Sequence, residues 1–68
     1  MNILDVQIEN YGSIWLITPM TASARQWIEE NVGAESWQWI GGRLDVEPRY
    51  IENLANGMQA AGLSVSLN

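Results

Sequence analysis

The sequence predicts an α+β fold in which two helices cover one face of a small mixed sheet, in a two-layer domain with the element order β-β-α-β-α-β. Three observations lead to this prediction. Three short runs alternate apolar and polar residues with the period of a β-strand. Two longer runs have apolar residues at helical spacing and helix-boundary residues at their ends. The 68 residues suit one domain, and we expect residues 1–68 to form it.

The first two strands are expected at residues 3–9 and 13–18. In the first run, ILDVQIE, every second residue is apolar, as in a half-buried strand. The Asn-Tyr-Gly sequence between the two runs predicts a tight turn. The second run, SIWLIT, is apolar on both faces, with Trp15 and Ile17 together on one of them. Such a strand is either covered on both faces or has one face against a partner.

The two helices are expected at residues 22–32 and 48–61. Thr21 is a natural N-cap for the first helix, and Pro48 suits the first turn of the second, where its missing N–H does no harm. Gly62 ends the second helix, and the run LSVSL after it is the last strand. The apolar stripes consist of Ala24, Trp27, Ile28 and Val32 in the first helix, and of Ile51, Leu54, Ala55, Met58 and Ala61 in the second.

The segment SWQWIGG permits two conformations before the alternating strand at residues 43–47. In one, residues 37–40 form a short strand that the two glycines turn back into a hairpin. In the other, residues 37–40 are an extended loop, and the glycines let the backbone pass close to the sheet. Because residues 37–40 are few and follow an irregular stretch, we expect the extended loop. An extended chain places Trp37 and Trp39 on the same side.

The charge of the chain restricts its partners. Eight acidic residues face three arginines, lysine is absent, and the formal net charge is -5. Binding to nucleic acid or to an anionic membrane requires a basic surface, which the chain lacks. An acidic protein attracts basic partners instead, although the same charge also serves solubility alone. We therefore expect no direct nucleic acid and no membrane, and a protein partner such as a basic nucleic-acid-binding host complex.

The residue types present argue against an enzyme. Histidine, cysteine and lysine are all missing, so the common acid–base groups and nucleophilic dyads cannot be built. A zinc site would need carboxylates alone, which zinc disfavours. Asp45 and Glu47 are a formal carboxylate pair, but acids two residues apart on a strand are typical of a solvated edge. We expect no catalytic residues, no metal and no cofactor.

A candidate binding surface combines the two neighbouring tryptophans with the charged residues that follow them. We expect one ring to close the core and the other to anchor a partner, because tryptophan is enriched at interface hot spots. The charged residues then form a polar rim, although a local ion-pair cluster explains them equally. The predicted partner-binding residues are Trp37, Trp39, Arg43, Asp45, Glu47 and Arg49.

Self-association is the alternative prediction. A small core and a strand with two apolar faces are typical of a chain that buries one face in a second copy. In that case Trp15 and Ile17 form the dimer interface, and the protein is a homodimeric structural or regulatory module.

Several motifs resemble a group of short, mostly uncharacterised bacterial proteins that are often found in prophages and other mobile elements. The likeness spans most of the chain, and its sharpest element is VEPRY before a helix. The residues that carry it are Gly12-Ser13-Ile14, Pro19 with Thr21-Ala22, Trp27, Gly41-Gly42, residues 46–50, Gly57-Met58 and Gly62-Leu63.

The resemblance implies a small phage or prophage accessory protein and no established reaction. Small acidic phage proteins often bind a host machine and block it, as inhibitors of CRISPR–Cas complexes do. Those complexes hold nucleic acid in basic channels, which an acidic protein could occlude. The first ten residues have no basic region and no long apolar run, so we expect neither a signal peptide nor a membrane span, and a location in the bacterial host cytoplasm.

Overall fold

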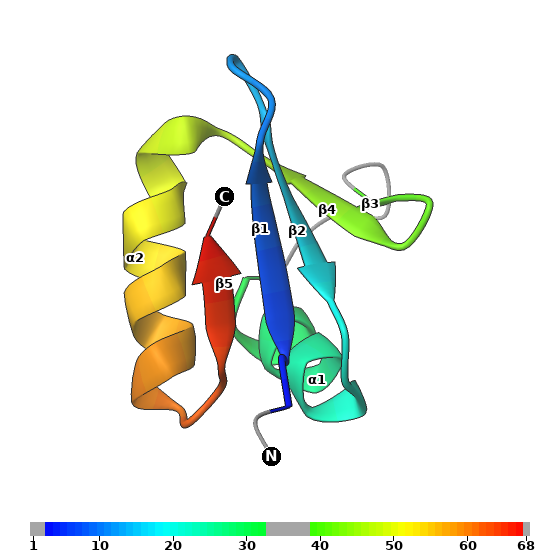
Figure 1. Ribbon diagram of the computed structural model, residues 1–68, viewed down its shortest axis with the longest axis vertical. Helices are drawn as coiled ribbons and strands as arrows, with labels where there is room; N and C mark the ends of the chain where they lie inside the picture. Colours follow the sequence, from blue (N-terminus) through cyan, green and yellow to red (C-terminus); the bar gives the residue numbers. More distant parts are fainter. Residues whose placement is uncertain (1–2, 33–38, 68) are drawn as a thin grey trace.

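The structure is a computed structural model, and it describes residues 3–32 and 39–67. The predicted α+β class and element order are confirmed, with one additional two-residue strand before the third predicted strand (Figure 1). The elements are β1 (Val6–Asn10), β2 (Trp15–Pro19), α1 (Ala22–Asn31), β3 (Trp39–Ile40), β4 (Arg43–Val46), α2 (Pro48–Ala60) and β5 (Val65–Leu67).

The sheet is mixed and has the strand order β3-β4-β2-β1-β5. Only the β1–β5 pair is parallel among the described strands, and the other three pairs are antiparallel. The register places Ile17 of β2 between Ile8 of β1 and Leu44 of β4. Residues that face each other across strands lie on the same side of a sheet, so these three side chains form one apolar face.

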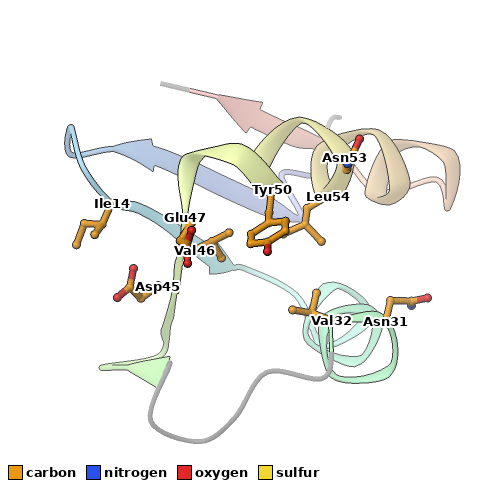
Figure 2. Close-up of a pocket in the computed structure, with 9 residues that line it drawn as sticks. All are labelled: Ile14, Asn31, Val32, Asp45, Val46, Glu47, Tyr50, Asn53 and Leu54. Atoms are coloured by element: carbon orange, nitrogen blue, oxygen red, sulfur yellow. The ribbon is translucent and has the colours of Figure 1, made fainter.

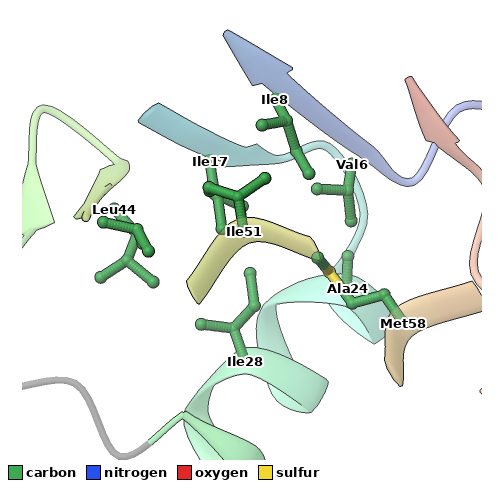
Figure 3. Close-up of a cluster of buried hydrophobic side chains, with 9 residues drawn as sticks. Val6, Ile8, Ile17, Ala24, Ile28, Leu44, Ile51 and Met58 are labelled. Atoms are coloured by element: carbon green, nitrogen blue, oxygen red, sulfur yellow. The ribbon is translucent and has the colours of Figure 1, made fainter. Parts of the chain in front are cut away.

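Both helices pack on this apolar face, as predicted. Figure 3 shows side chains from α1 and α2 meeting those of β1, β2 and β4 in one cluster. Burying an aliphatic side chain of this size contributes about 1.5–3 kcal/mol, so the cluster is the main source of stability. The buried residues are Val6, Ile8, Ile17, Ala24, Ile28, Leu44, Val46, Ile51 and Met58.

The helix ends follow the predicted boundary residues. Thr21 is the N-cap of α1, and its Oγ1 accepts a hydrogen bond from the backbone N–H of Ala24 at 3.2 Å. At the end of α2, Gly62 has a φ of +88°, and the N–H of Leu63 donates to the carbonyl of Met58 at 3.0 Å. This pattern is a Schellman motif, which needs a residue that tolerates positive φ.

The extended loop expected before β4 is wrong for residues 39 and 40, which instead form the strand β3 of a hairpin. Gly41 and Gly42 have φ values of +55° and +80°. A two-residue hairpin turn of this type requires positive φ at both positions, and glycine adopts it without steric cost. Residues 37 and 38, which the prediction also included, lie outside the described residues.

The expected dimer interface at Trp15 and Ile17 faces the inside of a single chain. Ile17 is 0% exposed, and Trp15 is half-buried against the same core. The reason is the register, since Trp15 lies opposite Val46 on the face that the helices cover. The structure therefore assigns Ile17 to the core of one chain rather than to a contact between two.

The other face of the sheet has no helix against it among the described residues, but it is not an apolar surface. Leu16 lies between Glu9 of β1 and Asp45 of β4. Arg43 reaches from β4 across β2 to Glu9, with 3.9 Å between the charged atoms. Leu16 is half-buried on this face. Beside it, the Thr18 hydroxyl is buried without a hydrogen-bond partner among the described residues.

Asp5 joins three separate segments of the chain. Its Oδ1 accepts a hydrogen bond from the Thr21 hydroxyl at 2.8 Å, and its Oδ2 accepts one from the Ser64 backbone N–H at 2.9 Å. Its own backbone N–H donates to the Ser64 carbonyl, and its carbonyl accepts from the N–H of Met20. The start of β1 is thereby tied to the cap of α1 and to the turn before β5.

These hydrogen bonds favour the ionised carboxylate, so the pKa of Asp5 lies below its ordinary value of 3.8. The Ser64 N–H is the larger cause and the Thr21 hydroxyl the smaller. A lowered pKa in the folded state means that the stabilisation is present above the unfolded-state pKa. It is lost as the pH falls through the folded-state pKa.

We expect Asp5→Asn to lower the urea midpoint at neutral pH, because an amide is a weaker acceptor and mismatches the two donors. The difference from wild type should shrink as the pH falls below the ordinary Asp pKa and through the lowered folded-state pKa of Asp5, because the wild-type carboxylate then also becomes neutral. The control is Asp45→Asn, at a carboxylate without a side-chain hydrogen bond among the described residues, and its midpoint should stay near that of wild type. A difference between Asp5→Asn and wild type that is constant over this pH range would contradict the account.

The two helices touch where Trp27 of α1 crosses Gly57 of α2. A Cβ atom at position 57 would lie 3.0 Å and 3.2 Å from two carbons of the Trp27 ring. Glycine at this position therefore lets the indole lie directly on the backbone of α2, although glycine weakens a helix interior.

Replacing Gly57 with leucine should destabilise the fold by about 1–3 kcal/mol, because the added side chain must displace the Trp27 ring. Asn56→Leu is the matched control on the exposed neighbouring position, and we expect no loss there. Urea unfolding measures both variants, and the Trp27 indole N–H resonance reports the displacement. Equal stability of the two variants would show that Gly57 has no packing role.

Candidate functional site

A pocket with a volume of about 460 Å³ lies between the end of α1, the end of β4 and the first two turns of α2 (Figure 2). Its walls come from segments far apart in the sequence, which only the fold brings together. The residues that line it are Ile14, Asn31, Val32, Asp45, Val46, Glu47, Tyr50, Asn53 and Leu54.

The abrupt passage from β4 into α2 positions one wall. β4 ends at Val46, Glu47 is the N-cap in an extended conformation, and Pro48 begins the helix with no intervening loop. Positions three and four residues apart share one side of a helix, so Tyr50 is aligned with Asn53 and Leu54. All three side chains line the pocket as a consequence.

The inner wall is apolar. Val46 is 5% exposed, and Val32 and Leu54 are half-buried against the core. Figure 2 shows the Tyr50 ring between Val46 and Leu54, at the centre of the pocket. Asn31 contributes an amide at the α1 end, where its Nδ2 donates to the Trp27 carbonyl at 2.9 Å. The pocket therefore offers an apolar surface bordered by polar groups.

Two acidic residues lie at the β4 side of the pocket, and they differ in position. Asp45 alternates with the inward-facing Leu44 and Val46, and Figure 2 shows its carboxylate on the side of β4 away from the Tyr50 ring. Glu47 lies at the strand–helix junction, where its Oε2 is 3.0 Å from Nε of Arg49. No basic residue is among the residues that line the pocket.

The three arginines all lie beside carboxylates of the same chain. Two of them also lie over an aromatic ring, which is a favourable place for a guanidinium. Each arginine charge is therefore balanced by a neighbouring carboxylate. The net negative charge comes from the acidic residues that do not pair with an arginine. The contacts are Arg25 with Glu29 at 3.2 Å and over the Trp39 ring at 4.3 Å, Arg43 with Glu9 at 3.9 Å, and Arg49 with Glu47 at 3.0 Å and over the Tyr50 ring at 4.8 Å.

The structure divides the predicted partner-binding residues between different surfaces. Trp39 lies opposite Leu44 on the helix-covered face, half-buried and beneath the Arg25 guanidinium. Arg43 extends over the uncovered face toward Glu9. Trp37 lies outside the described residues.

The remaining three predicted residues come together at the pocket. Asp45 and Glu47 line it, and Arg49 is held beside Glu47 and Tyr50 at its edge. No sequence pattern pointed to the apolar and amide residues of the pocket as a binding site. Leu54 belongs to the apolar stripe predicted for the second helix. Tyr50 lies four residues before Leu54, which places both residues on the same side of that helix.

Among residues 3–32 and 39–67, no group of three histidine, cysteine, aspartate or glutamate side chains is arranged to hold a metal ion. No helix in the same part of the chain has the length and apolarity needed to cross a membrane. No family model matches the sequence, and comparisons with curated proteins and with solved structures gave no match either.

Proposed function

We propose that the protein acts by binding another protein, with the pocket at the centre of the interface. The observation that supports this most is the composition of the pocket, an apolar wall bordered by amides and carboxylates. An apolar centre with a polar border is the usual anatomy of a protein interface. The volume of about 460 Å³ also falls in the range of natural binding pockets, about 300–1,000 Å³.

The charge of the protein favours a basic partner. The net charge is -5, and each arginine is already beside a carboxylate of its own chain. The acidic surface thus attracts a cationic surface over a distance of about 8–10 Å at ordinary salt. The lack of histidine, cysteine and lysine supports binding rather than catalysis as the activity.

Within this class, we propose that the partner is a basic, nucleic-acid-binding host complex and that the protein inhibits it. The support is the likeness of the VEPRY and related motifs to prophage proteins, together with the acidic charge. CRISPR–Cas effectors are the obvious candidates, because they hold nucleic acid in positively charged channels. The mechanism is steric and electrostatic occlusion of such a channel.

The binding proposal is tested by blocking the pocket without removing a core contact. Asn53 is exposed and lines the pocket, whereas Asn56 is exposed on the same helix and does not line it. We expect tagged Asn53→Trp to lose at least about tenfold in affinity for the partner that wild type captures from a bacterial lysate. Asn56→Trp is the matched control and should bind as wild type does. Affinities are measured by calorimetry with the purified partner.

Two outcomes would contradict the proposal. In one, both tryptophan variants bind the partner with equal affinity, which would place the interface elsewhere. In the other, every tagged protein recovers only untagged copies of itself, which would favour the homodimeric structural or regulatory module.

The inhibition proposal has its own measurement. Expression of the protein in a cell with an active CRISPR–Cas system should restore transformation by a targeted plasmid. The Asn53→Trp variant should lose this effect, and Asn56→Trp should keep it. If the wild-type protein binds a different host partner and plasmid interference is unchanged, the proposed inhibition of CRISPR–Cas is wrong. The proposal that the protein acts by binding another protein would still hold.

A further inference from the structure

We infer that the pocket receives a partner segment in which an apolar side chain is followed by an arginine. The apolar side chain enters beside Val46, Tyr50 and Leu54, and the guanidinium reaches the carboxylate of Glu47. This inference rests on the proposed binding function and specifies the chemistry of the partner. It follows from three features of the pocket.

The first feature is the apolar wall. Val32 and Leu54 are half-buried against the core and still line the pocket, so each leaves apolar surface in contact with water, and Val46, which is 5% exposed, completes this wall. Covering that surface with an apolar side chain is favourable in proportion to the area removed from water. A purely cationic ligand would leave this wall hydrated, so charge alone does not match the pocket.

The second feature is the carboxylate of Glu47 at the border of the pocket. Asp45 and Glu47 are among the described residues that line the pocket, whereas Arg49, the partner of Glu47, lies at its edge. The Asp45 carboxylate lies on the side of β4 away from the Tyr50 ring, so Glu47, at the strand–helix junction, is the group that pairs with a bound cation. Among the described residues, Asp45 has neither a side-chain hydrogen bond nor an ion pair.

The third feature is that a guanidinium already lies at this edge. Arg49 is 3.0 Å from Glu47, and its guanidinium lies 4.8 Å from the centre of the Tyr50 ring. The Arg49 and Glu47 side chains are 70% and 65% exposed, so their ion pair is weak and can be replaced. An arginine fits better than a lysine, because its planar group both pairs with a carboxylate and stacks on an aromatic ring.

The test uses three short peptides and NMR chemical-shift titration of the whole chain. The probes are acetyl-Leu-Arg-amide, acetyl-Leu-citrulline-amide, which has the same shape without the charge, and acetyl-Gly-Arg-amide, which lacks the apolar side chain. We expect the Leu-Arg peptide to shift the Val32 and Leu54 methyl resonances and the Tyr50 ring resonances. Each of the other two peptides should bind about three- to tenfold more weakly.

Three variants separate a specific contact from the general charge. Glu47→Gln should abolish the difference between the Leu-Arg and Leu-citrulline peptides. Glu52→Gln removes the same charge from an exposed position of α2 outside the pocket, and should preserve that difference. Arg49→Gln removes the competing guanidinium, and should tighten binding of the Leu-Arg peptide about two- to fivefold.

Equal affinity for the arginine and citrulline peptides would overturn the inference, as would shifts confined to the uncovered face of the sheet. If Glu47→Gln and Glu52→Gln lowered the preference for the Leu-Arg peptide equally, that preference would come from the net charge of the protein, and the specific contact with Glu47 would be refuted. If no peptide binds but Asn53→Trp still abolishes capture of the partner, the inference about the peptide fails and the proposed function survives. If Asn53→Trp and Asn56→Trp also behave alike, both fail.

Discussion

The covering of one face of the sheet by both helices is the constraint on which the rest of the structure depends. The register sets Ile17 between Ile8 and Leu44, and this apolar face must be removed from water. α1 and α2 therefore share it, and they lie close enough for the Trp27 ring to rest on Gly57. The pocket is the space that remains beside this contact, where α1 ends and α2 begins.

The same constraint determines how the charged residues are used. The Arg43–Glu9 bridge crosses the face of the sheet that neither α1 nor α2 covers, so this face offers less apolar surface than its strand sequence suggests. Asp5 is committed to hydrogen bonds that hold three segments together. The acidic residues thus do not act as one uniform surface, and Asp45 and Glu47 are the two that border an apolar pocket.

The local structure was predictable because short-range rules decide it. The alternation of β1, the Thr21 cap and the Pro48 start follow from residues that are neighbours in the sequence. The β3–β4 hairpin was not predicted, although it obeys a local rule, because two glycines with positive φ stabilise a two-residue turn even when one of the strands has only two residues.

The site was predictable only in part, because contacts between distant residues decide it. Asp5 accepts hydrogen bonds from Thr21, which is 16 positions away in the sequence, and from Ser64, which is 59 positions away. No local sequence pattern indicates such distant partners. For a strand with two apolar faces, the sequence does not state which face the helices cover, so a dimer interface at Trp15 and Ile17 was an open alternative. The sequence correctly grouped Asp45, Glu47 and Arg49, because residues this close in the sequence stay close in the fold. It also grouped Trp39 with Arg43, but the two side chains lie on opposite faces of the sheet.

The central claim is that partners bind at the pocket, and site-specific labelling tests it most directly. The chain has no cysteine, so a single introduced thiol can be labelled without interference. An environment-sensitive fluorophore is attached at Asn53→Cys, beside the pocket, or at Gln7→Cys, on the uncovered face of the sheet. On titration with the captured partner, the account predicts a saturable change in emission at position 53 and none at position 7. A change at position 7 alone would contradict it and move the interface to the uncovered face.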